Sequence, residues 1–209
     1  MHDLSAQRGI DRQRIGALED TALVAETVSG STAAFDELVL RYREKVVRLV
    51  ASVVGFRTDI EDIVQDIFVK VYLSLGRFRG DASFSTYLYT TAVNRCRDEL
   101  RRGKLRRFFS FDDWFSSDSA AHPHSENDQQ VDADERRDAV RAAMKRLPPD
   151  TQMLLYLREI EELSYKELAD VFKVEMGTIK SRLARARDRL RDELLPYMRD
   201  GNMPGDTQN

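Results

Sequence analysis

The sequence predicts an all-α protein of two small helical domains joined by a flexible acidic linker, the C-terminal domain containing a helix-turn-helix. Apolar residues recur at three-and-four spacing along both halves of the chain, which is the period of one face of an α-helix. A polar, acidic stretch separates the two halves. Two amphipathic segments with a short break between them lie near the C-terminus. With 209 residues, 42% of them hydrophobic, the chain can form two small cores.

The first half predicts four helices after a loose N-terminal extension over residues 1–19. The first begins at Asp20 and ends before Gly30, and the second continues to about Gly55. The third starts near Asp59, where early acids favour the positive end of the helix dipole. Gly80 then breaks the chain, and the fourth helix runs to about Arg102. Residues 20–102 are therefore expected to form one domain.

Residues 103–132 are predicted to be the linker because charge is segregated there. Residues 94–107 contain seven Lys or Arg against two acids, whereas residues 108–135 contain eight acids and no Lys or Arg. The composition is that of a disordered tether. A basic helix end is thus followed directly by an acidic segment.

Residues 133–195 are expected to form the second domain, with residues 196–209 as a tail. Ser164 and Glu167 predict a capping box at the start of the first helix of the helix-turn-helix. The second helix has a predicted buried stripe of Met176, Ile179, Leu183, Ala186 and Leu190. Its opposite side carries Gly177, Ser181, Ala184, Arg185 and Asp188, with Thr178, Lys180, Arg182 and Arg187 on the flanks.

That outer face carries small side chains in its middle and basic side chains at its edges. Small residues let a helix approach base edges in a DNA groove, and Arg and Lys reach bases or phosphates. The alternative is an ordinary pair of helices with a solvated basic face.

The segment from Arg77 to Arg97 interleaves aromatic residues with arginines. Flat rings and guanidinium groups are what the binding of unstacked single-stranded bases requires. The alternative is a set of core aromatics, since Phe84, Leu88 and Ala92 recur at a helical spacing of four.

Several classes of protein are not expected. A lone cysteine, Cys96, excludes an intramolecular disulfide, and no apolar run approaches the roughly 18 residues of a membrane span. The N-terminus lacks a signal-peptide core, so we expect a cytoplasmic protein. No nucleophile-base pair, phosphate-binding glycine loop or set of metal ligands is evident. We therefore expect no enzyme activity, catalytic residue, metal, cofactor or small-molecule substrate.

Four motifs carry a family resemblance. They are D-I-E-D-I-V-Q-D-I-F-V-K-V-Y from Asp59, F-R-G-D-A-S-F-S-T-Y-L-Y-T-T-A-V-N from Phe78, L-P-P-D-T-Q from Leu147, and the segment from Leu163 to Arg187. Over about residues 20–195 the chain resembles the bacterial RNA polymerase sigma factors of the extracytoplasmic-function (ECF) group, in the sigma-70 superfamily. The resemblance implies a subunit that binds core RNA polymerase and promoter DNA, directs promoter-specific initiation and helps to melt the DNA. It also implies an anti-sigma factor as partner, often a membrane-bound one.

The resemblance assigns roles to three groups of residues. The helix that binds core polymerase matches Glu61, Asp62, Gln65 and Asp66. The residues that match the segment binding the minus-ten element are Arg79, Phe84, Tyr87, Asn94 and Arg95. Recognition of the minus-thirty-five element falls to Thr178, Lys180, Ser181, Arg182, Ala184 and Arg185. The domain of residues 20–102 then corresponds to sigma region 2 and that of residues 133–195 to region 4.

Two residues depart from the family pattern. Tyr87 stands where the family usually has Trp, which preserves a ring for stacking. Lys173 stands where helix-turn-helix units usually have Gly, so a left-handed backbone there would cost about 1–2 kcal/mol.

The alternative function is a stand-alone helix-turn-helix regulator that binds duplex DNA without polymerase.

Overall fold

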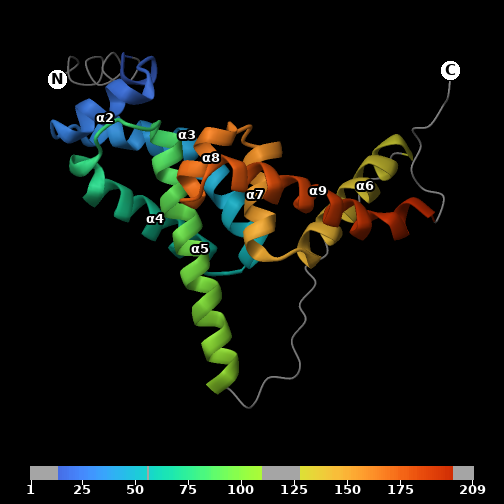
Figure 1. Cartoon of the computed structure of the whole chain (residues 1–209). Helices are drawn as coiled ribbons and strands as arrows, with labels where there is room; N and C mark the ends of the chain where they lie inside the picture. Colours follow the sequence, from blue (N-terminus) through green and yellow to red (C-terminus); the bar gives the residue numbers. More distant parts are fainter. Residues whose placement is uncertain (1–13, 56, 110–127, 200–209) are drawn as a thin grey trace.

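A computed structural model describes residues 14–55, 57–109 and 128–199, and every regular element within these ranges is helical (Figure 1). The all-α prediction is confirmed. The elements in chain order are α2 (Asp20–Val28), α3 (Thr32–Val54), α4 (Ile60–Ser74), the 3-10 turn η1 (Leu75–Arg77), α5 (Phe84–Phe109), α6 (Asp128–Arg146), α7 (Pro149–Glu159), α8 (Tyr165–Phe172) and α9 (Met176–Arg199).

Helices α2 to α5 pack around one part of the core. Leu23, Leu38, Leu49, Ile67 and Leu88 are each fully buried there. They come from α2, α3, α4 and α5, so each of the four helices contributes one apolar face. Gly80, at φ 76°, makes the turn before α5, a conformation that costs little without a Cβ. The four helices predicted for the N-terminal half are confirmed.

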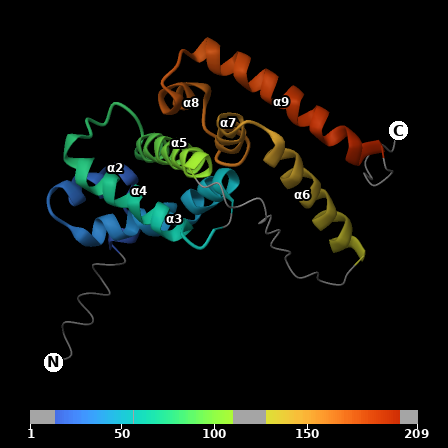
Figure 2. The ribbon, with the colours of Figure 1, turned by 90° about the horizontal axis from the view of Figure 1, so that it is seen from below.

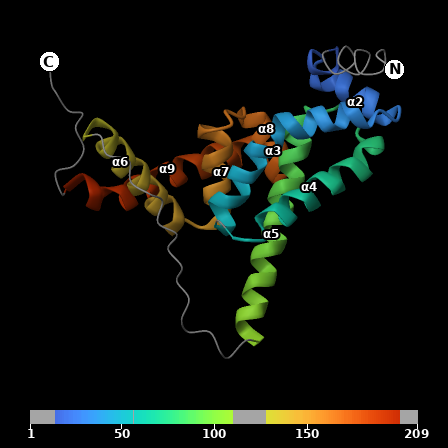
Figure 3. The ribbon, with the colours of Figure 1, turned by 180° about the vertical axis from the view of Figure 1, so that it is seen from behind.

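Helices α6 to α9 form the second helical domain. Met153 and Leu157 of α7 and Ile179 of α9 are fully buried, and Leu168 of α8 lies with them. The far end of α9 pairs with α6, and the two project together from the body (Figures 1 and 3). Arg146 of α6 is ion-paired with Glu193 of α9 at 3.3 Å.

The helix-turn-helix is confirmed in detail. The Ser164 hydroxyl accepts from the Glu167 amide, and the Glu167 carboxylate accepts from the Ser164 amide, so the predicted capping box forms. Lys173 ends α8 in the left-handed region, at φ 55° and ψ 52°. The turn that glycine usually makes is therefore made here by a lysine.

Three helix boundaries differ from the sequence prediction. Helix α5 continues past Arg102 to Phe109, because the Leu, Lys and Arg that follow are good helix formers and tolerate Gly103. Helix α6 already begins at Asp128, and α9 runs past Leu195 to Arg199 with Pro196 inside it. The middle of the predicted linker, residues 110–127, and the N-terminal residues 1–13 lie outside the described residues.

The two domains pack directly against each other. Helix α5 lies along α8, and α3 lies along α7 (Figures 1 and 2). In Figure 2, α5 lies between α4 on one side and α7 and α8 on the other. None of the described helices combines the length and apolarity that a membrane crossing requires.

Candidate nucleic-acid and polymerase interfaces

The outer face of α9 is exposed as a groove-reading helix requires. Ile179, Leu183 and Ala186 are at most 2% exposed and fix the helix on the domain. On the other side Lys180, Ala184 and Arg185 are exposed, and Arg182 is exposed on the flank. Thr178 and Ser181 are half-buried, and the Ser181 hydroxyl donates to the Thr178 carbonyl at 3.0 Å. The structure thus brings all six predicted residues onto one stretch of helix.

Two residues of the predicted buried stripe are not buried, since Leu190 is half-buried and Met176 is exposed. Met176 is 47% exposed, because it is the first residue of α9 and precedes the turn that packs on α8. The stripe therefore begins at Ile179. On the flank, Arg187 pairs with Glu159 at 2.8 Å and is directed to its own domain.

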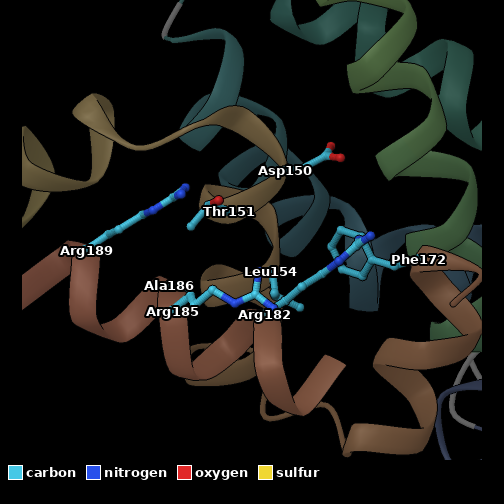
Figure 4. A pocket seen from close by; sticks show the side chains of 8 residues that line it. All are labelled: Asp150, Thr151, Leu154, Phe172, Arg182, Arg185, Ala186 and Arg189. Carbon is cyan, nitrogen blue, oxygen red and sulfur yellow. The ribbon is translucent and has the colours of Figure 1, made fainter. Parts of the chain in front are cut away.

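Arginines also line a cleft between α9 and α7. Arg182, Arg185 and Arg189 point to the side of α9 that faces Asp150 and Thr151 at the start of α7 (Figure 4). The open cleft has a volume of about 240 Å³. Arg189 is not among the predicted DNA-binding residues, although its spacing of four from Arg185 places it on the same side of the helix.

The predicted minus-ten residues divide between two sides of α5. Tyr87 and Asn94 are seven residues apart, hence two turns along one face, and Asn94 is exposed. Phe84 and Arg95 lie on the buried side, at 2% and 7% exposure. The fifth residue, Arg79, is exposed in the loop before the helix.

Tyr87 forms part of a small aromatic platform. Its ring centroid lies 5.1 Å from that of Phe78, and its hydroxyl donates to Ser74 Oγ at 2.5 Å. Phe78 is not among the predicted site residues, although the interleaving of aromatics and arginines includes it. The two half-buried rings come from either side of the Gly80 turn, so the turn is what brings them together.

Phe84 and Arg95 are held inside the domain. The Phe84 ring meets the Tyr42 ring edge-on at 5.4 Å, which agrees with the alternative of a core aromatic. Arg95 donates to Glu99 at 2.9 Å and to Asp66 at 3.3 Å. Burial lowers the pKa of Arg95, whereas the bonds to Glu99 and Asp66 raise it. The bonds together outweigh burial, so the pKa of Arg95 lies above the ordinary arginine value. Both side chains are buried, so they support the exposed surface of α5 from inside the domain and are not part of that surface.

Helix α4 presents the predicted polymerase-binding residues on one exposed face. Glu61, Asp62, Gln65 and Asp66 are all exposed. Val69 and Leu73 continue the stripe, at 49% and 77% exposure. An apolar spot beside acids is a composition suited to a protein partner. Glu61 pairs with Arg43 of α3 at 2.6 Å, which fixes one end of the face.

Among the described residues, no three His, Cys, Asp or Glu side chains converge as metal ligands. Cys96 is fully buried, and burial raises the pKa of its thiol to about 12. A thiol held protonated in this way is a poor nucleophile.

Comparisons with known proteins show the family to which the two helical domains belong. Residues 38–106 match the model for Sigma-70 region 2, and residues 137–190 match that for Sigma-70, region 4. The chain is 34% identical to the RNA polymerase sigma-H factor of Pseudomonas aeruginosa, over 87% of this chain and 97% of that protein. It belongs to the ECF RNA polymerase sigma factors. It is also 35% identical to the ECF sigma-E factor of Escherichia coli K12, over the same shares of the two chains.

Two solved structures share the fold of this sigma factor. CnrH, in complex with the cytosolic domain of CnrY, aligns with a TM-score of 0.60 and 24% identity over 84% of this chain and 96% of CnrH. The sigma factor RpoE of Bartonella quintana, in complex with the anti-sigma factor NepR, aligns with a TM-score of 0.61 and 25% identity over 77% of this chain and 96% of RpoE. As a member of this family, the protein directs promoter-specific transcription initiation.

Proposed function

We propose that three surfaces divide the work of initiation in this sigma factor. The outer face of α9 reads the minus-thirty-five element as duplex, the exposed side of α5 holds the melted minus-ten strand, and the acidic face of α4 binds core polymerase. The observation that carries this proposal is the exposure of Lys180, Ala184 and Arg185 on a helix whose opposite side is buried from Ile179 to Ala186. Such a helix can enter a groove without loss of its own packing.

On α9, Ala184 and Ser181 allow close approach, while Lys180 and Arg185 contact base edges or phosphates. Arg182 lies at the flank, and Thr178 lies in the first turn of the helix. A good bidentate contact to a base contributes about 1–3 kcal/mol of discrimination. Sequence preference is therefore expected to depend on few side chains.

On α5, Tyr87 and Phe78 offer rings for an unstacked base, and Asn94 offers hydrogen bonds two turns further along. Arg79 contacts the backbone of the strand. Phe84 and Arg95 act indirectly, since both are buried and hold the helix in place. Each stacked base can return about 1–3 kcal/mol of the cost of opening the duplex.

On α4, Glu61, Asp62, Gln65 and Asp66 form the polar part of the polymerase contact, and Val69 is the apolar spot beside them. We place the protein in the cytoplasm, where it joins core polymerase and itself makes and breaks no covalent bond. An anti-sigma factor is the expected regulator, since the similar Bartonella quintana RpoE is bound to one.

Holoenzyme binding to a panel of promoter variants tests the role of α9. Lys180→Ala and Arg185→Ala are expected to weaken binding by roughly 5- to 150-fold and to change the preference at individual upstream positions. Arg187→Ala is the matched control, because Arg187 has the same charge on the same helix but pairs with Glu159. Unchanged preference in both variants would refute the proposed role.

The stand-alone regulator makes a different prediction. It would bind promoter duplex tightly and specifically without polymerase. A gel-shift assay with and without core enzyme therefore separates the two, and we expect specific binding only in the presence of core polymerase.

A further inference from the structure

The cleft between α7 and α9, here called the α7–α9 cleft, carries an excess of positive charge. Arg182, Arg185 and Arg189 line it at spacings of three and four, so they lie on one side of α9. Among the described residues, the guanidinium group of none of the three forms an ion pair or a hydrogen bond. On the opposite side of α9, by contrast, Arg187 is bound to Glu159 through two nitrogens, at 2.8 and 3.0 Å. The cleft therefore gathers three arginines without an acidic partner in the part of the chain that the structure describes.

Asp150 is the one acid among the residues that line the cleft, and its charge is already matched. Its two carboxylate oxygens accept from Arg97 of α5, at 3.0 and 3.1 Å. Thr151 follows it and lines the cleft opposite the arginines of α9 (Figure 4). Both residues belong to the first turn of α7, where the helix dipole adds partial positive charge. The cleft thus favours an anion.

The shape and chemistry of the cleft favour a phosphate group. A guanidinium group is a planar fork of N–H donors that matches the oxygens of a phosphate or a carboxylate, and three forks around one space suit the anion with more oxygens. The volume of about 240 Å³ has room for a phosphate group and several waters, since one water takes about 30 Å³. Leu154, Phe172 and Ala186, all buried, form an apolar floor that weakens the screening of the charges.

The cleft lies along one flank of the helix proposed to read the upstream element. The major groove is about 12 Å wide and an α-helix with its side chains is about 10–12 Å across, so a seated helix has a phosphodiester backbone on each flank. Arg185 belongs to both the outer face and the cleft. Arg189, one turn further, belongs to the cleft and is not among the residues predicted to read bases.

We propose that the α7–α9 cleft is a phosphate-binding site, in which Arg189 acts with Arg182, Arg185 and Thr151 to hold one phosphate group. Two sources offer this chemistry. One is the phosphodiester backbone beside the upstream element, and this source rests on the proposed function of α9. The other is a free phosphate or pyrophosphate anion, which does not rest on it. Arg189 supplies affinity without sequence information, as contacts to phosphate do.

The salt dependence of promoter binding tests the first source. Each phosphate that a protein neutralises contributes about 0.9 to the slope of log K against log salt concentration. In the holoenzyme, Arg189→Ala is expected to lower the steepness of this slope by about 0.9. It should weaken binding roughly 5- to 10-fold at about 0.1 M salt, equally for every upstream sequence variant.

Two further variants control this measurement. Arg189→Lys keeps the charge and should keep the slope. Arg187→Ala is the matched control, because Arg187 lies on the same helix but is bound to Glu159, and it should leave the slope unchanged. Arg189 is exposed and has no ion pair among the described residues, so its replacement should leave the fold intact.

Titration of inorganic pyrophosphate into the free, full-length protein tests the second source by calorimetry. If the cleft takes a free anion, the wild type binds pyrophosphate and Arg189→Ala binds it about tenfold more weakly, as the loss of a charge-assisted hydrogen bond predicts. Arg187→Ala should bind as the wild type does.

The outcomes separate the two sources. A reduced salt slope without pyrophosphate binding assigns the site to the duplex, and pyrophosphate binding that needs Arg189, with an unchanged slope, assigns it to a free anion. Both effects together mean that one site accepts either. An unchanged slope, with pyrophosphate binding absent or independent of Arg189, overturns the phosphate site. The proposed function fails on a different result, an unchanged base preference in Lys180→Ala and Arg185→Ala.

Discussion

Arg95 of α5 donates to Asp66 of α4 at 3.3 Å, so the helix proposed to hold the melted strand is tied to the helix proposed to bind polymerase. The two partners differ in environment. The side chain of Arg95 is 8% exposed and that of Asp66 is 60% exposed. A substitution at the polymerase-binding face can therefore affect the buried Arg95 through its ion pair with Asp66.

The first prediction concerns this ion pair. Arg95→Ala removes the cation that lies 2.9 Å from the buried Glu99, which keeps the more distant Arg57 at 3.4 Å. We expect the free energy of unfolding to fall by about 3 kcal/mol in urea titrations. Asp66→Asn, at an exposed partner, should cost less than about 1 kcal/mol. Equal costs for the two variants would contradict this account of the network.

The second prediction concerns the turn of the helix-turn-helix. Lys173 has φ 55° and ψ 52°, a conformation that glycine adopts without strain. Lys173→Gly is expected to stabilise the protein by about 1 kcal/mol. Lys166→Gly, inside α8, should destabilise it by a similar amount because the backbone there is helical. Thermal unfolding of the two variants would show opposite shifts, and shifts of the same sign would be inconsistent with the turn.

Local features of the fold could be predicted from the sequence because neighbours along the chain determine them. The capping box of Ser164 and Glu167 depends on a spacing of three, and the buried stripe of α9 depends on helical period. The prediction that Met176 is buried is wrong because a residue at the end of a helix has fewer neighbours to cover it. Helical period alone thus predicted most of the surface of α9.

Features that depend on distant residues could not be predicted. Phe84 was a candidate for stacking on DNA and also for the core, and only Tyr42 on another helix decides between them. Arg95 is buried in the domain, and one of its two partners, Asp66, lies 29 residues away along the chain on another helix. Glu161 has no local motif at all, since its partners Lys45 and Tyr89 come from the other domain.

The third prediction concerns stability at alkaline pH. Burial raises the pKa of the Cys96 thiol from 9.0 to about 12, so the unfolded chain loses this proton at lower pH than the folded one. The stabilisation is therefore present below pH 9 and is lost as the pH rises from 9 toward 12. Tyr42, Tyr89 and Tyr156, whose pKa values burial also raises, act in the same direction at higher pH.

Cys96→Ala isolates the contribution of the thiol. Between pH 8 and pH 10 the wild type should lose about 1 kcal/mol more unfolding free energy than the variant, since one proton per molecule is worth about 1.4 kcal/mol per pH unit. The packing cost of the variant is measured separately at pH 7. Parallel pH profiles for the two proteins would contradict a buried, protonated thiol.

The last prediction separates the ring of Tyr87 from its hydroxyl. The ring lies 5.1 Å from that of Phe78, while the hydroxyl donates to Ser74 at 2.5 Å. If the ring stacks on an unpaired base, Tyr87→Ala should weaken holoenzyme binding to a single-stranded minus-ten oligonucleotide by about 1–3 kcal/mol, or roughly 5- to 150-fold. Tyr87→Phe keeps the ring and loses only one hydrogen bond, whose net value is about 1 kcal/mol in stability. It should therefore bind the oligonucleotide within about threefold of the wild type.

Because α9 is unchanged in both variants, binding to the upstream duplex element should be retained. If Phe and Ala weaken single-strand binding equally, the hydroxyl and not the ring holds the strand.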